Sequence, residues 1–183
     1  FKKKVIAMPA DTKIKSILTK YASGTTATEP YWSPVFKLSI SEADEDDLSA
    51  LRKLGLLVNS AAKDQAFIEV NAVNAHGLTD KELSKLSSIQ EQIVQLKLGQ
   101  TKLTDGFMPQ IADMPLLIQL DLDHTAVSDK GVVALEELKY LESVNLYGTR
   151  VSDAGLMSLA KIKSLKRVYL WQSKVSEGGV AKL

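Results

Sequence analysis

Residues 140–153 read YLESVNLYGTRVSD, and segments of the same pattern begin at residues 92, 116 and 164. The pattern therefore recurs at a step of 24 residues, and a less complete unit precedes it at a step of 25. One apolar position of the pattern shows the step most directly, because it is filled by Leu78, Leu103, Val127, Val151 and Val175. Regular spacing over several units predicts an array in which each unit packs against its neighbours.

Each unit combines a helical period with a strand period. Leu156, Leu159 and Ile162 have the spacing of one helix face, whereas Val168 and Leu170 alternate as in a strand. Ser or Thr followed by an acidic residue precedes the helical part of each unit. The Ser or Thr side-chain oxygen can accept hydrogen bonds from the amides of the first turn, and the acidic side chain suits the positive end of the helix. Glycines recur shortly afterwards, where we expect close approach of the neighbouring turn: Gly131, Gly155 and Gly179.

The repeated pattern, L-x-x-L-x-L-x-x-T-x-V-[ST]-D-x-G-L, resembles the short bacterial type of the leucine-rich repeat family. The resemblance implies an α/β solenoid with a parallel sheet on its concave face and helices on its convex face. The resemblance also implies that the chain binds other proteins, as most members of the family do, and that it has no catalytic site shared with the family. One unit departs from the pattern, since Phe107 takes the glycine position and Pro109 falls inside the expected helix. We expect an irregular or 3₁₀ helix there.

Three regions are expected along the chain: an N-terminal arm (1–37), an N-terminal capping unit (38–77) and the leucine-rich repeat domain (78–183). A cap is needed because a terminal repeat would otherwise expose apolar surface. Within the cap, Ser41 is expected to open a helix that Gly55 ends, followed by strand-like runs at 56–58 and 67–73.

The acidic run at residues 42–47 has two interpretations, a metal site or a first helical turn. Carboxylates crowded at a helix start are explained by the positive end of the helix dipole, and we prefer that interpretation.

The arm is expected to hold a short helix beginning at Asp11, a linker at residues 23–30 and an edge strand at residues 35–38. It is similar to the region before the repeats in large membrane-anchored proteins of Bacteroidetes and planctomycetes, which carry a c-type cytochrome domain. This resemblance implies a periplasmic or extracytoplasmic location, with a membrane anchor upstream of Phe1. A first residue other than Met agrees with an excised or processed piece.

Composition excludes several classes of function. The 183 residues are 45% hydrophobic and 25% charged, as in globular proteins, and no apolar run approaches the roughly 18 residues of a membrane span. With 23 basic and 22 acidic residues the net charge is +1, which disfavours nucleic-acid binding. Cysteine is absent, so disulfides, thiol nucleophiles and thiolate zinc sites are excluded from this sequence, and we expect no cofactor.

The best candidate binding surface is the outward face of the predicted sheet, because side chains alternate along each strand. Toward the C-terminal units this face becomes aromatic, and Tyr, Trp and Arg dominate protein-binding hot spots. Polar side chains of the preceding units tune its polarity. The predicted binding residues are Tyr147, Arg167, Tyr169, Trp171, Asp121 and Asn145.

Three functions suit this surface. The first is a non-enzymatic module that binds a protein partner, which could be another domain of the same polypeptide. The second is carbohydrate binding, because Trp and Tyr rings also stack on sugars. The third is a passive spacer or a dock for an upstream cytochrome domain, in which case the aromatic rings only shield or stabilise the sheet.

Catalysis and metal binding have little support in the sequence. The two histidines, His76 and His124, lie at or beside a loop position that other units fill with Gln, Ser or Thr. Asp121, Asp123 and His124 include possible metal ligands, but consecutive residues point apart on a regular strand. No nucleophile elbow or glycine-rich phosphate loop is present. We therefore expect neither an enzyme nor a metal site.

Overall fold

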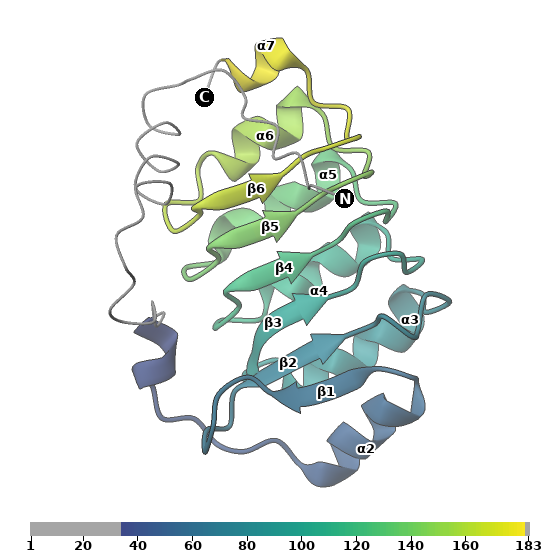
Figure 1. Ribbon diagram of the computed structural model, residues 1–183, viewed down its shortest axis with the longest axis vertical. Coiled ribbons are helices and arrows are strands. Elements are labelled where there is room, and N and C mark those ends of the chain that lie inside the picture. The colour runs from purple at the N-terminus through teal and green to yellow at the C-terminus, as the bar shows by residue number, and fades with distance from the viewer. Residues whose placement is uncertain (1–33, 182–183) are drawn as a thin grey trace, which may run out of the picture.

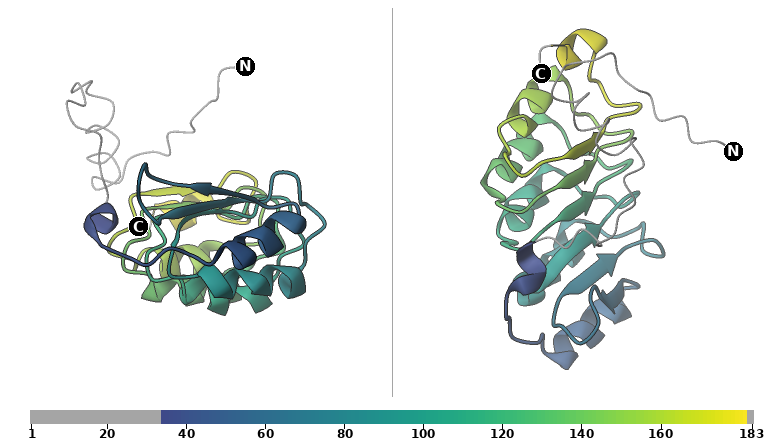
Figure 2. Two further views of the ribbon diagram at one scale, coloured as in Figure 1. Left: turned by 90° about the horizontal axis from the view of Figure 1, so that it is seen from below. Right: turned by 60° about the vertical axis from the view of Figure 1, so that its left-hand side comes forward.

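The computed structural model describes residues 34–181, which form an α/β fold with one six-stranded sheet (Figure 1). The helices from α2 onward lie along one face of the sheet (Figure 2). The strands are β1 (Leu57–Ser60), β2 (Ile68–Asn71), β3 (Ile93–Lys97), β4 (Gln119–Asp121), β5 (Ser143–Asn145) and β6 (Arg167–Tyr169). The α-helices are α2 (Glu45–Lys53), α3 (Asp80–Leu83), α4 (Met108–Ala112), α5 (Asp129–Val132), α6 (Asp153–Leu159) and α7 (Glu177–Val180). The 3₁₀ helices are η1 (Pro34–Lys37), η2 (Ser84–Ile89), η3 (Asp105–Phe107) and η4 (Val133–Glu137).

Strand order in the sheet follows the order of the chain, and every pair from β2 to β6 is parallel. From β3 onward each residue pairs with the one 24 positions later, as Leu96 with Leu120 and Leu120 with Val144. The predicted step of 24 is therefore the register of the sheet. Between β2 and β3 the register shifts between Ile68 and Glu69. The sequence repeat also has a step of 25 rather than 24 residues in this unit, from Leu78 to Leu103.

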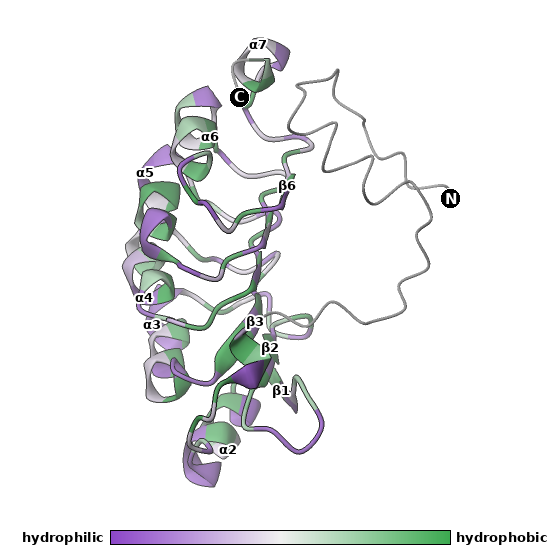
Figure 3. Cartoon of the chain, turned by 90° about the vertical axis from the view of Figure 1, so that its left-hand side faces the viewer, coloured by the Kyte–Doolittle hydropathy of each residue, from purple (hydrophilic) through white to green (hydrophobic). Residues whose placement is uncertain are grey.

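The core lies between the sheet and the helices. Leu98, Leu122 and Leu146 are fully buried, and their backbone N–H groups donate to the next unit along the sheet. The helices stack beside one another on the face of the sheet that they cover (Figure 3). Hydrophobic and hydrophilic residues alternate along the chain (Figure 3). The expected alternation of one strand and one helical segment per unit is confirmed in the sheet from β3 to β6.

The helices α5 and α6 begin as the sequence predicts. Ser128 and Ser152 are N-cap residues whose hydroxyl oxygens accept from the backbone N–H two positions later. The glycine position is tight, because a Cβ on Gly155 would lie 2.6 Å from Asp129 Oδ1. In the departing unit Phe107 belongs to the 3₁₀ helix η3, as expected, but Pro109 lies in the first turn of the α-helix α4.

The N-terminal capping unit contains the predicted helix and the two predicted strands, but the start of the helix and the pairing of the strands differ from the prediction. The first helix, α2, begins three residues later than predicted, because Asp44 rather than Ser41 is its N-cap and accepts from Asp46 N–H at 2.8 Å. The helix ends at the predicted place, where Gly55 has a φ of +87°. The two expected strands are β1 and β2, and they form an antiparallel pair rather than continuing the parallel series.

The predicted edge strand at residues 35–38 is wrong. Residues Pro34–Lys37 form η1, and Val35 is fully buried in a cluster with Phe67, Val94, Leu116 and Ile118. A β-branched residue after proline suits a strand by local preference, but burial of Val35 against the flank of the sheet decides its conformation. The helix predicted from Asp11 and the linker at 23–30 lie outside the described residues.

Candidate functional site

The face of the sheet opposite the helices is the candidate site, and we call it the open face. Among residues 34–181, no helix covers it (Figure 3). Its side chains come from alternate positions of each strand, which are half-buried or exposed, while the residues between them are buried in β3 to β5 and half-buried in β6. In β3 to β6 these positions are Gln95, Lys97, Gln119, Asp121, Ser143, Asn145, Arg167 and Tyr169.

The C-terminal part of the open face is aromatic, as predicted from the sequence. Tyr169 is 52% exposed and Trp171 is 57% exposed, and Arg167 is exposed on the same strand. Tyr147 is half-buried in the preceding unit, where Gly148 N–H donates to the Trp171 carbonyl at 2.9 Å. We call these four residues the aromatic zone.

Next to it lies a polar zone built around Asp121. Its Oδ1 accepts from Asn145 Nδ2 at 2.9 Å and from Asp123 N–H at 3.0 Å. Asn145 Oδ1 in turn accepts from Tyr147 N–H at 3.1 Å, so the polar zone is bonded to the aromatic zone. Burial raises the pKa of Asp121 above its ordinary value, and the negative charge of Asp123 adds to this rise.

His124 completes the polar zone. The sequence did not predict this role for His124. Its φ of 52° turns the chain, so His124 and Asp123 do not point apart as on a regular strand. Instead, His124 Nδ1 lies 2.9 Å from Asp123 Oδ2. The imidazole ring meets the Tyr147 ring edge to face, with centroids 4.5 Å apart.

Two glycines make room for these side chains. A Cβ on Gly99 would lie 1.8 Å from Asp123 Oδ1, and a Cβ on Gly148 would lie 3.0 Å from the His124 ring. The Asp123 carboxylate and the His124 ring therefore rest directly on the backbone of neighbouring units. This packing fixes their positions before any ligand arrives.

The positions of the histidines and carboxylates also bear on metal binding. Within residues 34–181, no group of three His, Asp or Glu side chains is placed to hold a metal ion. His76 is exposed in the segment between β2 and α3, on a different part of the chain from the polar zone. The polar zone can thus offer carboxylate, amide and imidazole groups to a partner.

Comparison with models of known protein families gave no match, and no curated protein is similar enough to count as a relative. In the part of the chain that the structure describes, no helix has the length and apolar character needed to cross a membrane. Any function assigned to the open face therefore rests on its residues and geometry.

Proposed function

We propose that this chain is a leucine-rich repeat solenoid whose open face is the concave surface and binds a protein partner. The 24-residue register, the Ser or Thr helix caps and the glycine contacts between units support the solenoid assignment. A repeat of this kind needs its neighbours to bury its apolar side, so the outward side chains are free to vary with the partner. The module acts without catalysis.

The observation that carries this proposal is the exposure of two large aromatic side chains, two residues apart in the last strand unit. Tyr169 and Trp171 each expose more than half of their surface, whereas the neighbouring positions of β4 and β5 on this side are polar. Exposed apolar groups that cluster mark interaction sites, and Trp, Tyr and Arg are enriched in binding hot spots. Arg167 lies on the same strand and can donate several hydrogen bonds at the rim.

The polar zone defines what the partner should present. Asp121 and Asp123 offer carboxylate oxygens beside the aromatic zone. A partner that places an apolar side chain on Trp171 and a basic or N–H donor group on the carboxylates would satisfy both zones. Because the carboxylates and His124 are already fixed by contacts within the sheet, less conformational entropy is lost on binding.

Affinity capture with matched variants tests the proposal. Trp171→Ala and Tyr169→Ala remove the aromatic side chains, whereas Met157→Ala and Val133→Ala remove side chains of similar exposure on the helix side, 47% and 51%. We expect a protein that wild type and both controls retain, and that both open-face variants lose. Equal retention by all five proteins would exclude the aromatic zone as the binding surface.

A second candidate function is carbohydrate binding, favoured by flat aromatic rings beside carboxylate and amide groups. Titration of the protein with neutral oligosaccharides, followed by tryptophan fluorescence, separates the two candidates. A change that disappears in Trp171→Ala would favour a sugar ligand. Protein capture without any response to sugars would favour the protein partner.

A further inference from the structure

At the opposite end of the sheet, the strand β1 has one edge that pairs with no other strand of residues 34–181. In the described residues β1 pairs only with β2, as the first strand of the sheet. Ala61 N–H donates to the Phe67 carbonyl at 2.7 Å, which fixes the alternation of the antiparallel pair. By this alternation Asn59 bonds to Glu69, while the backbone N–H and C=O groups of Val58 and Ser60 point away from β2.

A second contact agrees with this alternation. Ile68 is the partner of Ser60 in the register, and its N–H donates to the Gln92 carbonyl on the side of β3. Ile68 therefore directs its backbone groups toward β3, which leaves those of Ser60 on the outer edge.

This edge lacks three of the features that usually prevent a strand from pairing further, namely lysine, proline and a bulge. Native edges are protected by lysine, proline or a bulge. The strand β1 contains Leu57, Val58, Asn59 and Ser60, without lysine or proline, and its register with β2 is continuous. The other edge strand, β6, is shorter, begins with Arg167 and follows Lys166.

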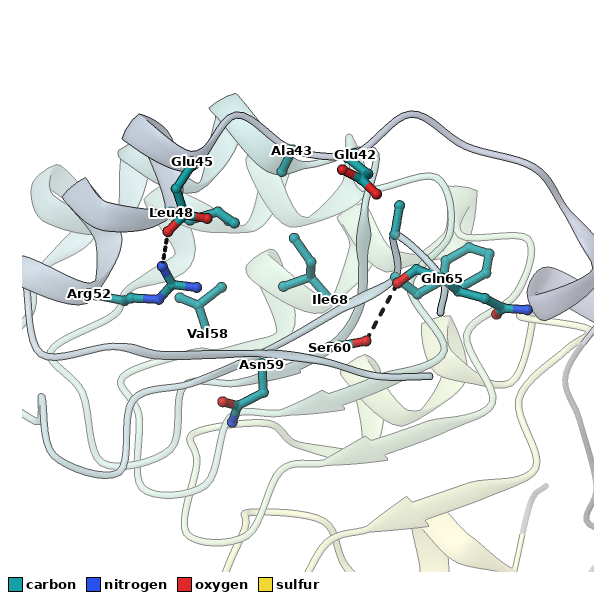
Figure 4. A pocket seen from close by; sticks show the side chains of 12 residues that line it. Glu42, Ala43, Glu45, Leu48, Arg52, Val58, Asn59, Ser60, Gln65 and Ile68 are labelled. Atoms are coloured by element: carbon teal, nitrogen blue, oxygen red, sulfur yellow. Dashed lines mark hydrogen bonds and ion pairs between the residues drawn. The ribbon is translucent and has the colours of Figure 1, made fainter. Parts of the chain in front are cut away.

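A pocket of about 260 Å³ opens beside this edge, between β1–β2 and the start of α2 (Figure 4). Apolar side chains of Leu48, Val58 and Ile68 line it, with Glu42 at its rim. Pockets for drug-sized molecules measure roughly 300–1,000 Å³. The smaller pocket beside an open strand edge suits a side chain of an added strand.

The charge around the pocket selects the kind of side chain. Residues 42–47 include five carboxylates, of which Glu42 and Glu45 line the pocket. Arg52 also lines it, but its guanidinium forms an ion pair with Glu45. A lysine side chain would place its aliphatic stem against the apolar lining and its ammonium near Glu42.

We propose that the outer edge of β1 binds an extended, lysine-containing segment of a protein partner. The segment adds a strand to the sheet through the backbone groups of Val58 and Ser60, and one lysine side chain enters the pocket. This surface is separate from the open face and uses main-chain recognition in place of aromatic contacts.

Two peptides of opposite charge test the proposal, Lys-Val-Lys-Ile-Lys-Val and Glu-Val-Glu-Ile-Glu-Val, both with blocked ends. We expect the intact chain to bind the lysine peptide and not the glutamate peptide in a calorimetric titration. Binding should also slow amide hydrogen exchange at Val58 and Ser60, because their N–H groups become paired. Exchange on the open face, at Tyr169 and Trp171, should stay unchanged.

Variants separate backbone pairing from general charge attraction. Ser60→Pro removes an outward N–H without breaking the pairing to β2, and should weaken lysine-peptide binding about tenfold. Glu42→Gln should weaken it about threefold, whereas Glu137→Gln, at an exposed glutamate of η4, should leave it unchanged. Thermal melting confirms that each variant is folded.

Three results would overturn the proposal. They are no binding of the lysine peptide, equal weakening by Glu42→Gln and Glu137→Gln, and binding without slower exchange at Val58 and Ser60. None of these bears on the aromatic zone, so failure here is distinguishable from failure of the proposed function.

Discussion

The carboxylate of Asp129 accepts hydrogen bonds from both the backbone N–H and the hydroxyl of Ser152, at 2.7 and 2.6 Å. Ser152 begins the helix of the next unit, so the acid at one helix start holds the cap of the following helix. The same pair of bonds recurs along the array and links Asp80 to Thr104, Asp105 to Ser128 and Asp153 to Ser176. The acid therefore joins neighbouring units as well as favouring its own helix.

Asp129→Ala should lower the free energy of unfolding by about 2–3 kcal/mol, because Ser152 and Gly155 lose a charged acceptor. Urea denaturation measures this change. Asp113→Ala, at an exposed aspartate that ends α4, should change stability by less than about 0.5 kcal/mol. Equal effects of the two substitutions would contradict the role of Asp129 as a link between units.

The glycine positions give a second test of contact between units. A Cβ on Gly155 would lie 2.6 Å from Asp129 Oδ1 and 2.8 Å from Val151 Cγ1, so Gly155→Ala should destabilise by about 1–3 kcal/mol. Gly178→Ala is the matched control, because its closest neighbour would be 3.7 Å away and alanine favours a helix. Thermal denaturation should show a lower Tm for Gly155→Ala only. A tolerated Gly155→Ala would show that the side chains of Asp129 and Val151 can shift to make room, and it would contradict a tight contact at this position.

The polar zone predicts a pH-dependent effect at Asp121. Because burial raises the pKa of this carboxyl, the unfolded chain ionises first as pH rises above about 4. The folded state therefore loses stability through that range, until Asp121 itself has ionised. Asp121→Asn keeps an oxygen that can accept from Asn145 and Asp123, but removes the buried charge.

We therefore expect Asp121→Asn to raise the free energy of unfolding at pH 7 and to leave it unchanged near pH 3. Denaturant unfolding at both pH values measures the difference. Asp113→Asn controls for the loss of one negative charge at an exposed position. A stabilisation by Asp121→Asn that is the same at both pH values would contradict a role for the buried charge.

The repeat made much of the sheet predictable from the sequence. A constant step of 24 residues places equivalent residues side by side, so the columns of the open face followed from arithmetic and strand alternation. The contact between Asp129 and Ser152 did not follow, because a helix-dipole role already explained the acid. Its position in every unit was a signal that the acid also serves the neighbouring helix.

The parts that were wrong or missed depend on tertiary contacts. Val35 lies in a 3₁₀ helix because it packs against Val94 and Leu116, which are distant in sequence. The contact between His124 and Asp123 requires a positive φ, which consecutive residues in a strand do not suggest. Gly148, 24 residues after His124, was the available signal, because glycine often marks such a backbone position.

That turn position supplies the last prediction. Gln100, His124, Gly148 and Gln172 all have positive φ, between 52° and 68°, and they follow one another at the repeat step. Residues other than glycine are strained in this left-handed backbone conformation. Gln100→Gly should therefore stabilise by about 0.5 kcal/mol, since Gln100 is exposed and relief of strain exceeds the added entropy of the unfolded chain.

Gly148→Ala should destabilise by about 1–2 kcal/mol for two separable reasons, the positive φ and a Cβ only 3.0 Å from the His124 ring. A double-mutant cycle with His124→Ala separates them. In the His124→Ala background the steric part disappears and the backbone part remains, so Gly148→Ala should cost less but still more than zero. An unchanged cost would mean that His124 does not rest on Gly148, and the packing that fixes the polar zone would then need another origin.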